Sequence, residues 1–278
     1  MTYRAHRYRK SAGSLIVATI CFFCFWQISS IACAAEVSSE AVPIVAELLL
    51  GGWLDGKWVD ANTIASSVPA GKIYHTYSFD GQLQDLVGGA PTAESSNIDY
   101  WDINFAAEVD SDGDRLKIGS EKSGMPRLPK LQTGGLKPYE ELVASYLKRN
   151  KISAKPEIQQ LVRIDLDGDG SEEVIVVASN ADASIPILAK NTYSLVLFRR
   201  IQNGKVITSV LHEHYYHEDI EGQADSSNGY RVGFVVDING DGVLEMILNC
   251  RYYEGFWYEV YELKNNELIK VLSDGLGA

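Results

Sequence analysis

Two acidic loops with the same spacing carry the most specific chemistry in this sequence. They span residues 165–173 (DLDGDGSEE) and 237–245 (DINGDGVLE), and both read D-x-[DN]-x-D-G-x-x-E. Side-chain oxygens recur at positions 1, 3, 5 and 9 of this pattern, and a backbone carbonyl is available at position 7. Ca²⁺ takes roughly six to eight oxygen ligands in flexible geometry, and glycine at position 6 permits a sharp turn around an ion. The spacing therefore predicts two structural Ca²⁺ sites with the side-chain ligands Asp165, Asp167, Asp169, Glu173, Asp237, Asn239, Asp241 and Glu245.

The flanking sequence excludes an EF-hand, which needs glutamate at position 12 and a helix on each side. Position 12 is Val176 in one loop and Leu248 in the other, and predicted strands flank both loops. Placed between strands and inside a repeat, the spacing resembles the FG-GAP or VCBS-type repeats of integrin-like β-propellers over about residues 160–272.

That resemblance implies blade-like β units that hold Ca²⁺ through the eight residues named above. The chain differs from the family in offering two good loops where a full ring would carry more. The C-terminal stretch is also similar to exported bacterial proteins with such repeats, whose activity is generally unassigned. The alternative is an acidic turn that binds no ion. Such a turn would destabilise the folded chain, because four carboxylates in the first loop repel one another.

A third segment, residues 110–114 (DSDGD), begins the same pattern. Arg115 then replaces the glycine and Ile118 replaces the final acid. The segment is either a weaker third site or a polar hairpin turn.

A histidine cluster at residues 212–219 (HEHYYHED) is the other candidate metal site. On a strand, His212 and His214 point to one face, and His217 could fold back from the following loop. Three imidazoles with nearby carboxylates could bind Zn²⁺ or Ni²⁺. The spacing is not H-E-x-x-H, and the alternative is a coincidental group of polar residues at the end of a strand.

Eight short strands are expected to position these residues. Each is rich in β-branched or aromatic residues and bounded by Gly, Asn or Asp, and tight-turn residues join the third strand to the fourth in each set. Four strands joined by tight turns form an antiparallel meander that needs neighbours to bury its faces. The predicted strands are 160–165, 173–178, 193–201 and 205–211 in the first set, and 230–237, 244–250, 256–263 and 267–272 in the second.

The expected fold is mainly β, with antiparallel four-stranded meander repeats in an incomplete β-propeller-like arrangement and one or two short helices. The two repeats are placed at 160–216 and 230–272, within a C-terminal region of residues 159–278. An N-terminal region, residues 35–158, is expected to contain degenerate β units. Its predicted elements are helices at 42–50 and 138–149, strands at 72–78, 100–106 and 115–118, and loops at 88–97 and 119–135.

The first 34 residues have the order of a secretory signal peptide. Four basic residues precede an apolar run at 15–26 (LIVATICFFCFW), and the segment ends in small residues at Ala34. This order predicts cleavage after Ala34 and export to the periplasm or the medium. The apolar run is short for a membrane helix, which needs about 20 residues. An uncleaved N-terminal anchor or a lipoprotein processed at Cys33 is the alternative, and either would attach the chain to a membrane.

Charge and composition narrow the class of protein further. The 278 residues carry 25 Lys+Arg and 37 Asp+Glu, a net charge of −12, and cleavage after Ala34 would remove four basic and no acidic residues to give −16. Such an acidic chain is not expected to bind nucleic acid, which requires an excess of Lys and Arg. Of the four cysteines, Cys250 alone lies outside the first 34 residues, so we expect no internal disulfide in the exported chain.

The sequence favours an exported, non-catalytic Ca²⁺-binding module at the cell envelope that binds a protein or a glycan. A secreted hydrolase or metal-dependent enzyme that uses His212, His214 and His217, or a pair of acids, is the alternative. No G-x-S-x-G motif marks a nucleophile. Aromatic residues at 252–258 could form a ligand platform or pack between sheets.

Export predicts a shortened N-terminus. N-terminal sequencing or intact mass of the protein from its host should show the loss of about 34 residues, because the basic, apolar and small segments direct cleavage after Ala34. A full-length N-terminus in the membrane fraction would contradict cleavage, and a diacylglycerol mass on Cys33 would establish a lipoprotein.

Overall fold

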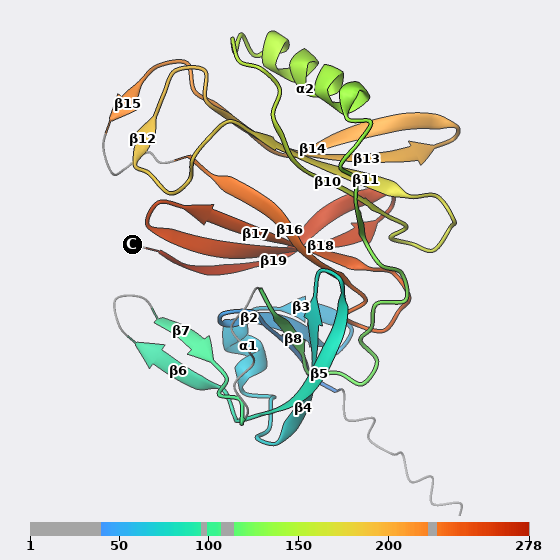
Figure 1. The fold of residues 1–278 in the computed structure, drawn as a ribbon. Helices are drawn as coiled ribbons and strands as arrows, with labels where there is room; N and C mark the ends of the chain where they lie inside the picture. Colours follow the sequence, from blue (N-terminus) through green and yellow to red (C-terminus); the bar gives the residue numbers. More distant parts are fainter. Residues whose placement is uncertain (1–39, 96–98, 107–113, 222–226, 278) are drawn as a thin grey trace, which may run out of the picture. The chain divides into compact units, whose positions relative to one another are not determined.

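A computed structural model describes residues 40–95, 99–106, 114–221 and 227–277 of the chain, all within one unit of residues 39–278. The expected signal segment, residues 1–34, and residues 110–113 of the third acidic segment lie outside the described residues. The described part is mainly β, with three larger antiparallel sheets and two helices, and none of these sheets closes into a barrel (Figure 1). Neither of these two helices is long and apolar enough to cross a membrane.

Sheet 1 is built from the N-terminal region and has the strand order β3-β2-β1-β8-β4-β5. Because β8 lies between β1 and β4, this sheet is not a sequential meander like the two that follow. Asp60 caps the N-terminus of helix α1 (Ala61–Ala65), and its side chain accepts a hydrogen bond from Thr63 N at 2.8 Å. The strands are β1 (Val42–Val45), β2 (Leu49–Leu54), β3 (Lys57–Val59), β4 (Lys72–Ser78), β5 (Gly81–Gly88) and β8 (Leu116–Ile118), and a separate ribbon pairs β6 (Thr92–Ser95) with β7 (Asp99–Asp102).

The helix predicted at residues 42–50 is wrong, because the segment forms β1, a bend and β2. Nearly every residue of this segment is buried, so both faces of the strands are apolar. A short apolar run buried on both faces lacks the alternation that distinguishes a strand from a buried helix. The predicted loop at 88–97 likewise contains β6, and the predicted strand at 100–106 is shorter, since β7 ends at Asp102.

Sheets 2 and 3 confirm the two predicted four-stranded meanders. In sheet 2 the two-residue strand β9 extends the meander beyond β10, and in sheet 3 the strands follow chain order. Two-residue turns join the third and fourth strands, where Asn203, Gly204, Asn265 and Asn266 have positive φ angles. Asparagine and glycine tolerate this conformation best. Sheet 2 contains β9 (Lys130–Leu131), β10 (Ile158–Ile164), β11 (Glu173–Ser179), β13 (Tyr193–Gln202) and β14 (Lys205–Tyr215); sheet 3 contains β16 (Gly229–Val236), β17 (Glu245–Tyr252), β18 (Gly255–Lys264) and β19 (Glu267–Gly277); β12 (Ile187–Leu188) pairs with β15 (Ile220–Glu221).

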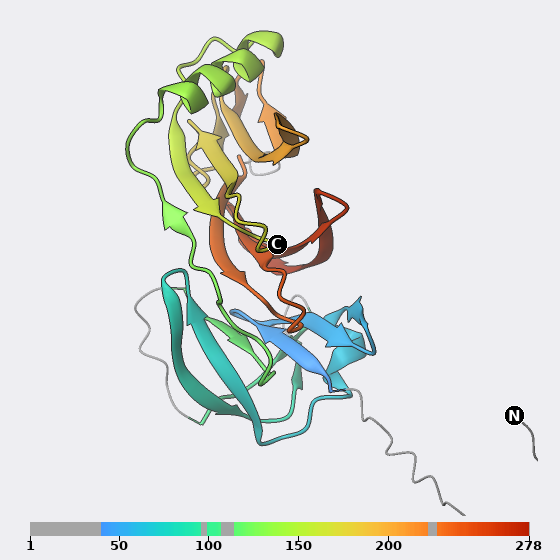
Figure 2. The same ribbon diagram turned by 90° about the vertical axis from the view of Figure 1, so that its right-hand side faces the viewer.

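Sheet 3 packs against sheet 2 on one face and sheet 1 on the other (Figures 1 and 2). Successive side chains of a strand point to opposite faces. In β16, Val235 accordingly lies in the core shared with sheet 2, whereas Phe234 and Val236 lie in the core shared with sheet 1. The aromatic run at 252–258 follows the same rule, since Trp257 packs toward sheet 2 and Tyr258 toward sheet 1. These two residues therefore support packing between sheets.

Helix α2 (Lys137–Arg149) covers the other face of sheet 2, as Figures 1 and 2 show. Its buried residues Val143, Tyr146 and Leu147 contact the outward-facing residues of β10, β11 and β13. The helix was predicted at 138–149. Pro138 lies in its first turn, where the lack of an N–H has no cost because N–H groups at a helix start have no partner within the helix.

Cys250 lies in the core between sheets 2 and 3, with 2 % of its surface exposed. Its thiol is free within the described residues. Burial raises the pKa of its thiol, which disfavours the reactive thiolate.

We therefore expect an aromatic disulfide reagent to label Cys250 slowly in native protein and rapidly in denaturant. The variant Ser273→Cys, at an exposed position of β19, provides a rapidly labelled control in the native state. Native labelling of Cys250 as fast as that of the control cysteine would show that the core is open there.

Candidate metal sites

Each acidic loop joins the first and second strands of its meander. The first loop follows β10 and ends where Glu173 begins β11, and the second follows β16 and ends where Glu245 begins β17. In both sheets this glutamate is the strand partner of the residue just before the loop, Ile164 or Val236. The strand ends therefore hold positions 1 and 9 of the loop close together.

The two loops have the same backbone conformation. Positions 4 and 6 are glycines with positive φ angles of 75° and 87° in the first loop and 76° and 89° in the second. Other residues are strained in this region, so the glycines allow the chain to fold back over the carboxylates. Equal conformations at equal positions make the second loop a structural copy of the first.

The hydrogen bonds inside the loops match as well. In both, the position 1 carboxylate accepts from the N–H groups of positions 4 and 6, and one oxygen of the position 9 glutamate accepts from the N–H of position 2. In the first loop, Gly168 N and Gly170 N donate to Asp165 at 2.7 and 3.1 Å, and Leu166 N donates to Glu173 at 2.9 Å. In the second loop, Gly240 N and Gly242 N donate to Asp237 at 2.7 and 2.9 Å, and Ile238 N donates to Glu245 at 2.8 Å.

The first loop gathers three acidic side chains around one point. Ligand atoms of Asp165, Asp167 and Glu173 all lie within 4.8 Å of one another, a spacing that suits oxygens around a single cation. Asp169 is exposed at the rim. Arg200, itself buried, places Nη2 3.5 Å from Asp167 Oδ2 and partly offsets the negative charge.

The second loop holds its glutamate deeper in the protein. Glu245 is completely buried, and its Oε1 atom has no hydrogen-bond partner among the described residues. Burial raises the pKa of Glu245 to about 9, and the charges of Asp241 and Asp237 add to the effect. A buried carboxylate oxygen without a donor is costly unless a cation binds it. In the same loop, Asn239 Oδ1 accepts from Asp241 N at 2.9 Å.

Burial also raises the pKa of Glu173 in the first loop. The charges of Asp167 and Asp169 act in the same direction, while the Leu166 N–H and Arg200 oppose them. The crowding of carboxylates evident in the sequence therefore contributes, but removal from water is the larger cause in both loops.

The third acidic segment is described only at its end. Asp114 Oδ2 accepts from Arg231 Nη1 at 3.0 Å and from Asn249 Nδ2 at 2.7 Å. This carboxylate therefore links the start of β8 to sheet 3.

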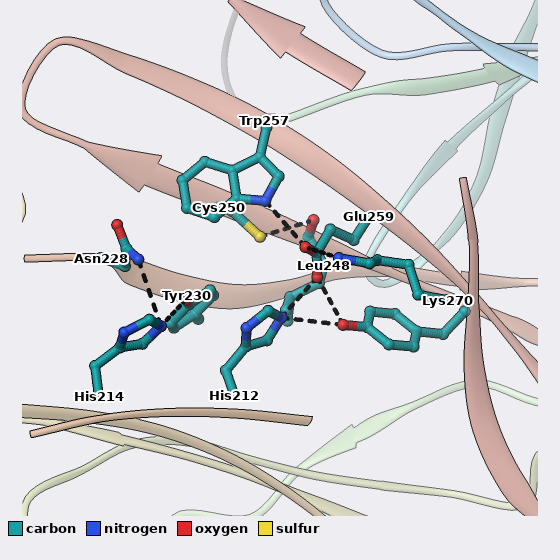
Figure 3. A network of polar contacts seen from close by, with 10 residues as sticks. His212, His214, Asn228, Tyr230, Leu248, Cys250, Trp257, Glu259 and Lys270 are labelled. Atoms are coloured by element: carbon teal, nitrogen blue, oxygen red, sulfur yellow. Dashed lines mark hydrogen bonds and ion pairs between the residues drawn. The ribbon is translucent and has the colours of Figure 1, made fainter. Parts of the chain in front are cut away.

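His212 and His214 lie on the same face of β14, as predicted, with nearly parallel rings whose centroids are 6.5 Å apart. His212 Nε2 is 2.6 Å from Glu259 Oε2 and 3.0 Å from the Tyr261 hydroxyl (Figure 3). His214 Nε2 instead contacts the Tyr230 hydroxyl at 2.9 Å. His217 is exposed beyond the end of β14, and the three imidazoles do not form a metal-binding group among the described residues.

Glu259 is the centre of this second network, and the motif search in the sequence missed it. It is 2 % exposed and accepts from Trp257 Nε1, Tyr261 Oη and Lys270 Nζ at 3.1, 2.6 and 2.9 Å (Figure 3). Burial alone raises its pKa, but the hydrogen bonds from His212, Tyr261 and Lys270 outweigh burial and hold the pKa at about 2. An acid inside the apolar strand β18 was the available signal in the sequence.

The described residues therefore contain two acidic loops rich in oxygen ligands, and one buried carboxylate, Glu259, that accepts hydrogen bonds from several side chains. Oxygen ligands without nitrogen or sulfur favour a hard cation such as Ca²⁺. No family model matches the sequence, and no curated protein or solved structure matches the chain.

The Glu259 network predicts a pH-dependent contribution to stability. A folded-state pKa of about 2 lies below the ordinary value of 4.5, so the contribution is complete above pH 4.5 and is lost as the pH falls toward 2. Glu259→Gln should therefore lower the free energy of unfolding by ~3 kcal/mol near pH 6, and this deficit should shrink in acid.

Urea unfolding of both proteins from pH 6 to pH 2.5 measures the difference, and Glu267→Gln, at an exposed position of β19, is the control. A deficit that stays constant across this range would show that Glu259 stabilises the fold through shape and not through charge.

Proposed function

We propose that this chain is an exported, non-catalytic Ca²⁺-binding β-repeat module of the FG-GAP/VCBS type. The observation that carries the proposal is the Oε1 atom of Glu245, which is buried, lacks a partner among the described residues and belongs to an acidic loop. A divalent cation would supply the missing interaction, and the matching first loop would bind a second ion.

The ligand set follows from the shared loop conformation. Asp165, Asp167, Asp169 and Glu173 would hold one ion, and Asp237, Asn239, Asp241 and Glu245 the other. The carbonyls of Ser171 and Val243 occupy position 7. Ca²⁺ accepts such flexible shells, whereas Mg²⁺ requires a tighter octahedron and retains its water.

The ions would stabilise the region where the two meanders meet. Leu244 N in the second loop donates to Leu166 O in the first at 2.8 Å, so the loops are in direct contact. The first strands of the meanders also lie side by side, since the Gln160 side chain exchanges two hydrogen bonds with the backbone of Val232. Adjacent first strands support a propeller-like arrangement of the two repeats.

A groove near these strands is the proposed place for a protein or glycan partner. Two cavities, of about 600 and 420 Å³, share Gln159, Tyr230 and Arg231 in their walls. Amide, guanidinium and aromatic groups together suit the hydroxyls and apolar faces of a glycan. His212 contacts Glu259 and Tyr261 whereas His214 contacts Tyr230, and the histidines form no metal-binding group among the described residues. These contacts support the binding role over a hydrolase that uses the three imidazoles as metal ligands.

Ca²⁺ is expected to raise the melting temperature. Binding to the folded state adds about 2.7 kcal/mol for each site at a hundredfold excess over Kd, which corresponds to roughly 5–10 °C for each site and roughly 10–20 °C for both. Glu245→Gln or Glu173→Gln should remove about half of this rise, because each variant disables one loop.

Glu172→Gln is the matched control. Glu172 neighbours Glu173 but pairs with Lys130 and Arg163 outside the loop, so its variant should melt earlier and keep the full Ca²⁺-dependent rise. Identical melting curves in millimolar Ca²⁺ and in excess chelator would reject the proposed function.

A further inference from the structure

One arginine outside both loops contacts the backbone of each. Arg127 lies in the segment 119–129 between β8 and β9, and its side chain is half-buried. Its Nε donates to Asp165 O at 2.6 Å, and its Nη2 donates to Leu166 O at 2.9 Å and to Gly242 O at 2.7 Å. A single guanidinium therefore connects positions 1 and 2 of the first loop to position 6 of the second.

The same segment contacts the second loop again. Gly124 and Asp237 exchange two backbone hydrogen bonds, with N–O distances of 2.9 and 2.8 Å. Segment 119–129 thus contacts position 1 of both loops, through Arg127 at Asp165 and through Gly124 at Asp237.

The anchored atoms lie next to the proposed ligands. Leu166, whose carbonyl binds Arg127, uses its N–H to hold Glu173. Gly242, the other anchor, uses its N–H to hold Asp237 and precedes the position 7 carbonyl. Movement of either set of ligands therefore displaces the guanidinium and, through it, the other loop.

We infer that the two Ca²⁺ ions bind with positive cooperativity and that Arg127 is the positioning residue that couples the sites. This inference rests on the proposed function. The first ion fixes one loop and orders the guanidinium, so the second ion binds to a loop that has less freedom left to lose. The coupling is reciprocal by thermodynamic necessity.

Electrostatics opposes this coupling but does not reverse it. The first ion makes the electrostatic potential at the second loop less negative, which weakens the attraction of the second ion. The effect is small because the carboxylates around the first ion carry more negative charge than the ion carries positive charge, and because salt screens the remaining interaction between the two sites. The hydrogen bonds of Arg127, in contrast, act at contact distance and are charge-assisted. We therefore expect the cooperativity to be stronger at physiological salt than at low salt.

Calcium titration of the chelator-stripped protein, by equilibrium dialysis with radioactive Ca²⁺, tests the inference. The protein should bind two ions with a Hill coefficient of about 1.4. Glu245→Gln should weaken binding at the intact first loop roughly fivefold, and Glu173→Gln should do the same to the second.

Arg127→Gln should still bind two ions, with a Hill coefficient of about 1, and Arg127→Lys should behave similarly because lysine lacks the forked donors. Arg149→Gln, on α2 away from the loops, is the control and should keep the cooperativity. If Arg127→Gln fails to fold, the two single-loop variants measure the coupling without it.

Each outcome separates the inference from the proposed function. Two ions that bind independently, with each single-loop variant leaving the other affinity unchanged, would overturn the coupling and leave the Ca²⁺ module intact. Cooperativity retained in Arg127→Gln would overturn the role of the arginine. Absence of Ca²⁺ binding would reject the proposed function itself.

Discussion

A buried glutamate at a strand start is the constraint on which the two loops depend. Glu173 and Glu245 are buried, and one carboxylate oxygen of each accepts a hydrogen bond from a backbone N–H of its own loop. A carboxylate in such a place is costly without donors or a cation. The glycine turns, the aspartate at position 1 and the clustered oxygens are all arranged around this group, which gives the loop one geometry whether it occurs in sheet 2 or in sheet 3.

The stacking of the three sheets makes the positions of the two acidic loops important for the packing of the protein. Sheet 3 is buried on both faces, so the end of β16 and the start of β17 cannot shift without disturbing both cores. The contact between Leu244 and Leu166 joins the loops at the edge of the core between sheets 2 and 3. An ion that stabilised the loops would therefore also stabilise the packing of the two sheets. The Glu259 network joins the same two sheets through His212 on β14.

The sequence predicted most of the C-terminal fold because its signals are local. The eight strands alternate or carry β-branched residues between turn residues, and the proposed ligands of each loop lie within nine residues of one another. Residues 42–50 were misread because burial of both faces removes the alternation. Arg127 could not be found, since its contacts reach 38 and 115 residues along the chain and a loop arginine has no distinguishing pattern. Burial, which is the main cause of the raised pKa values of Glu173 and Glu245, likewise cannot be read from the sequence before the packing of the sheets is known.

The stoichiometry of bound metal tests the central claim most directly. Elemental analysis of protein purified without chelator and dialysed against micromolar Ca²⁺ should find two calcium ions per chain, one for each loop. It should find one ion in the Glu245→Gln variant. A protein that contains no calcium under these conditions, and takes up none when millimolar Ca²⁺ is supplied, would contradict the assignment of both loops.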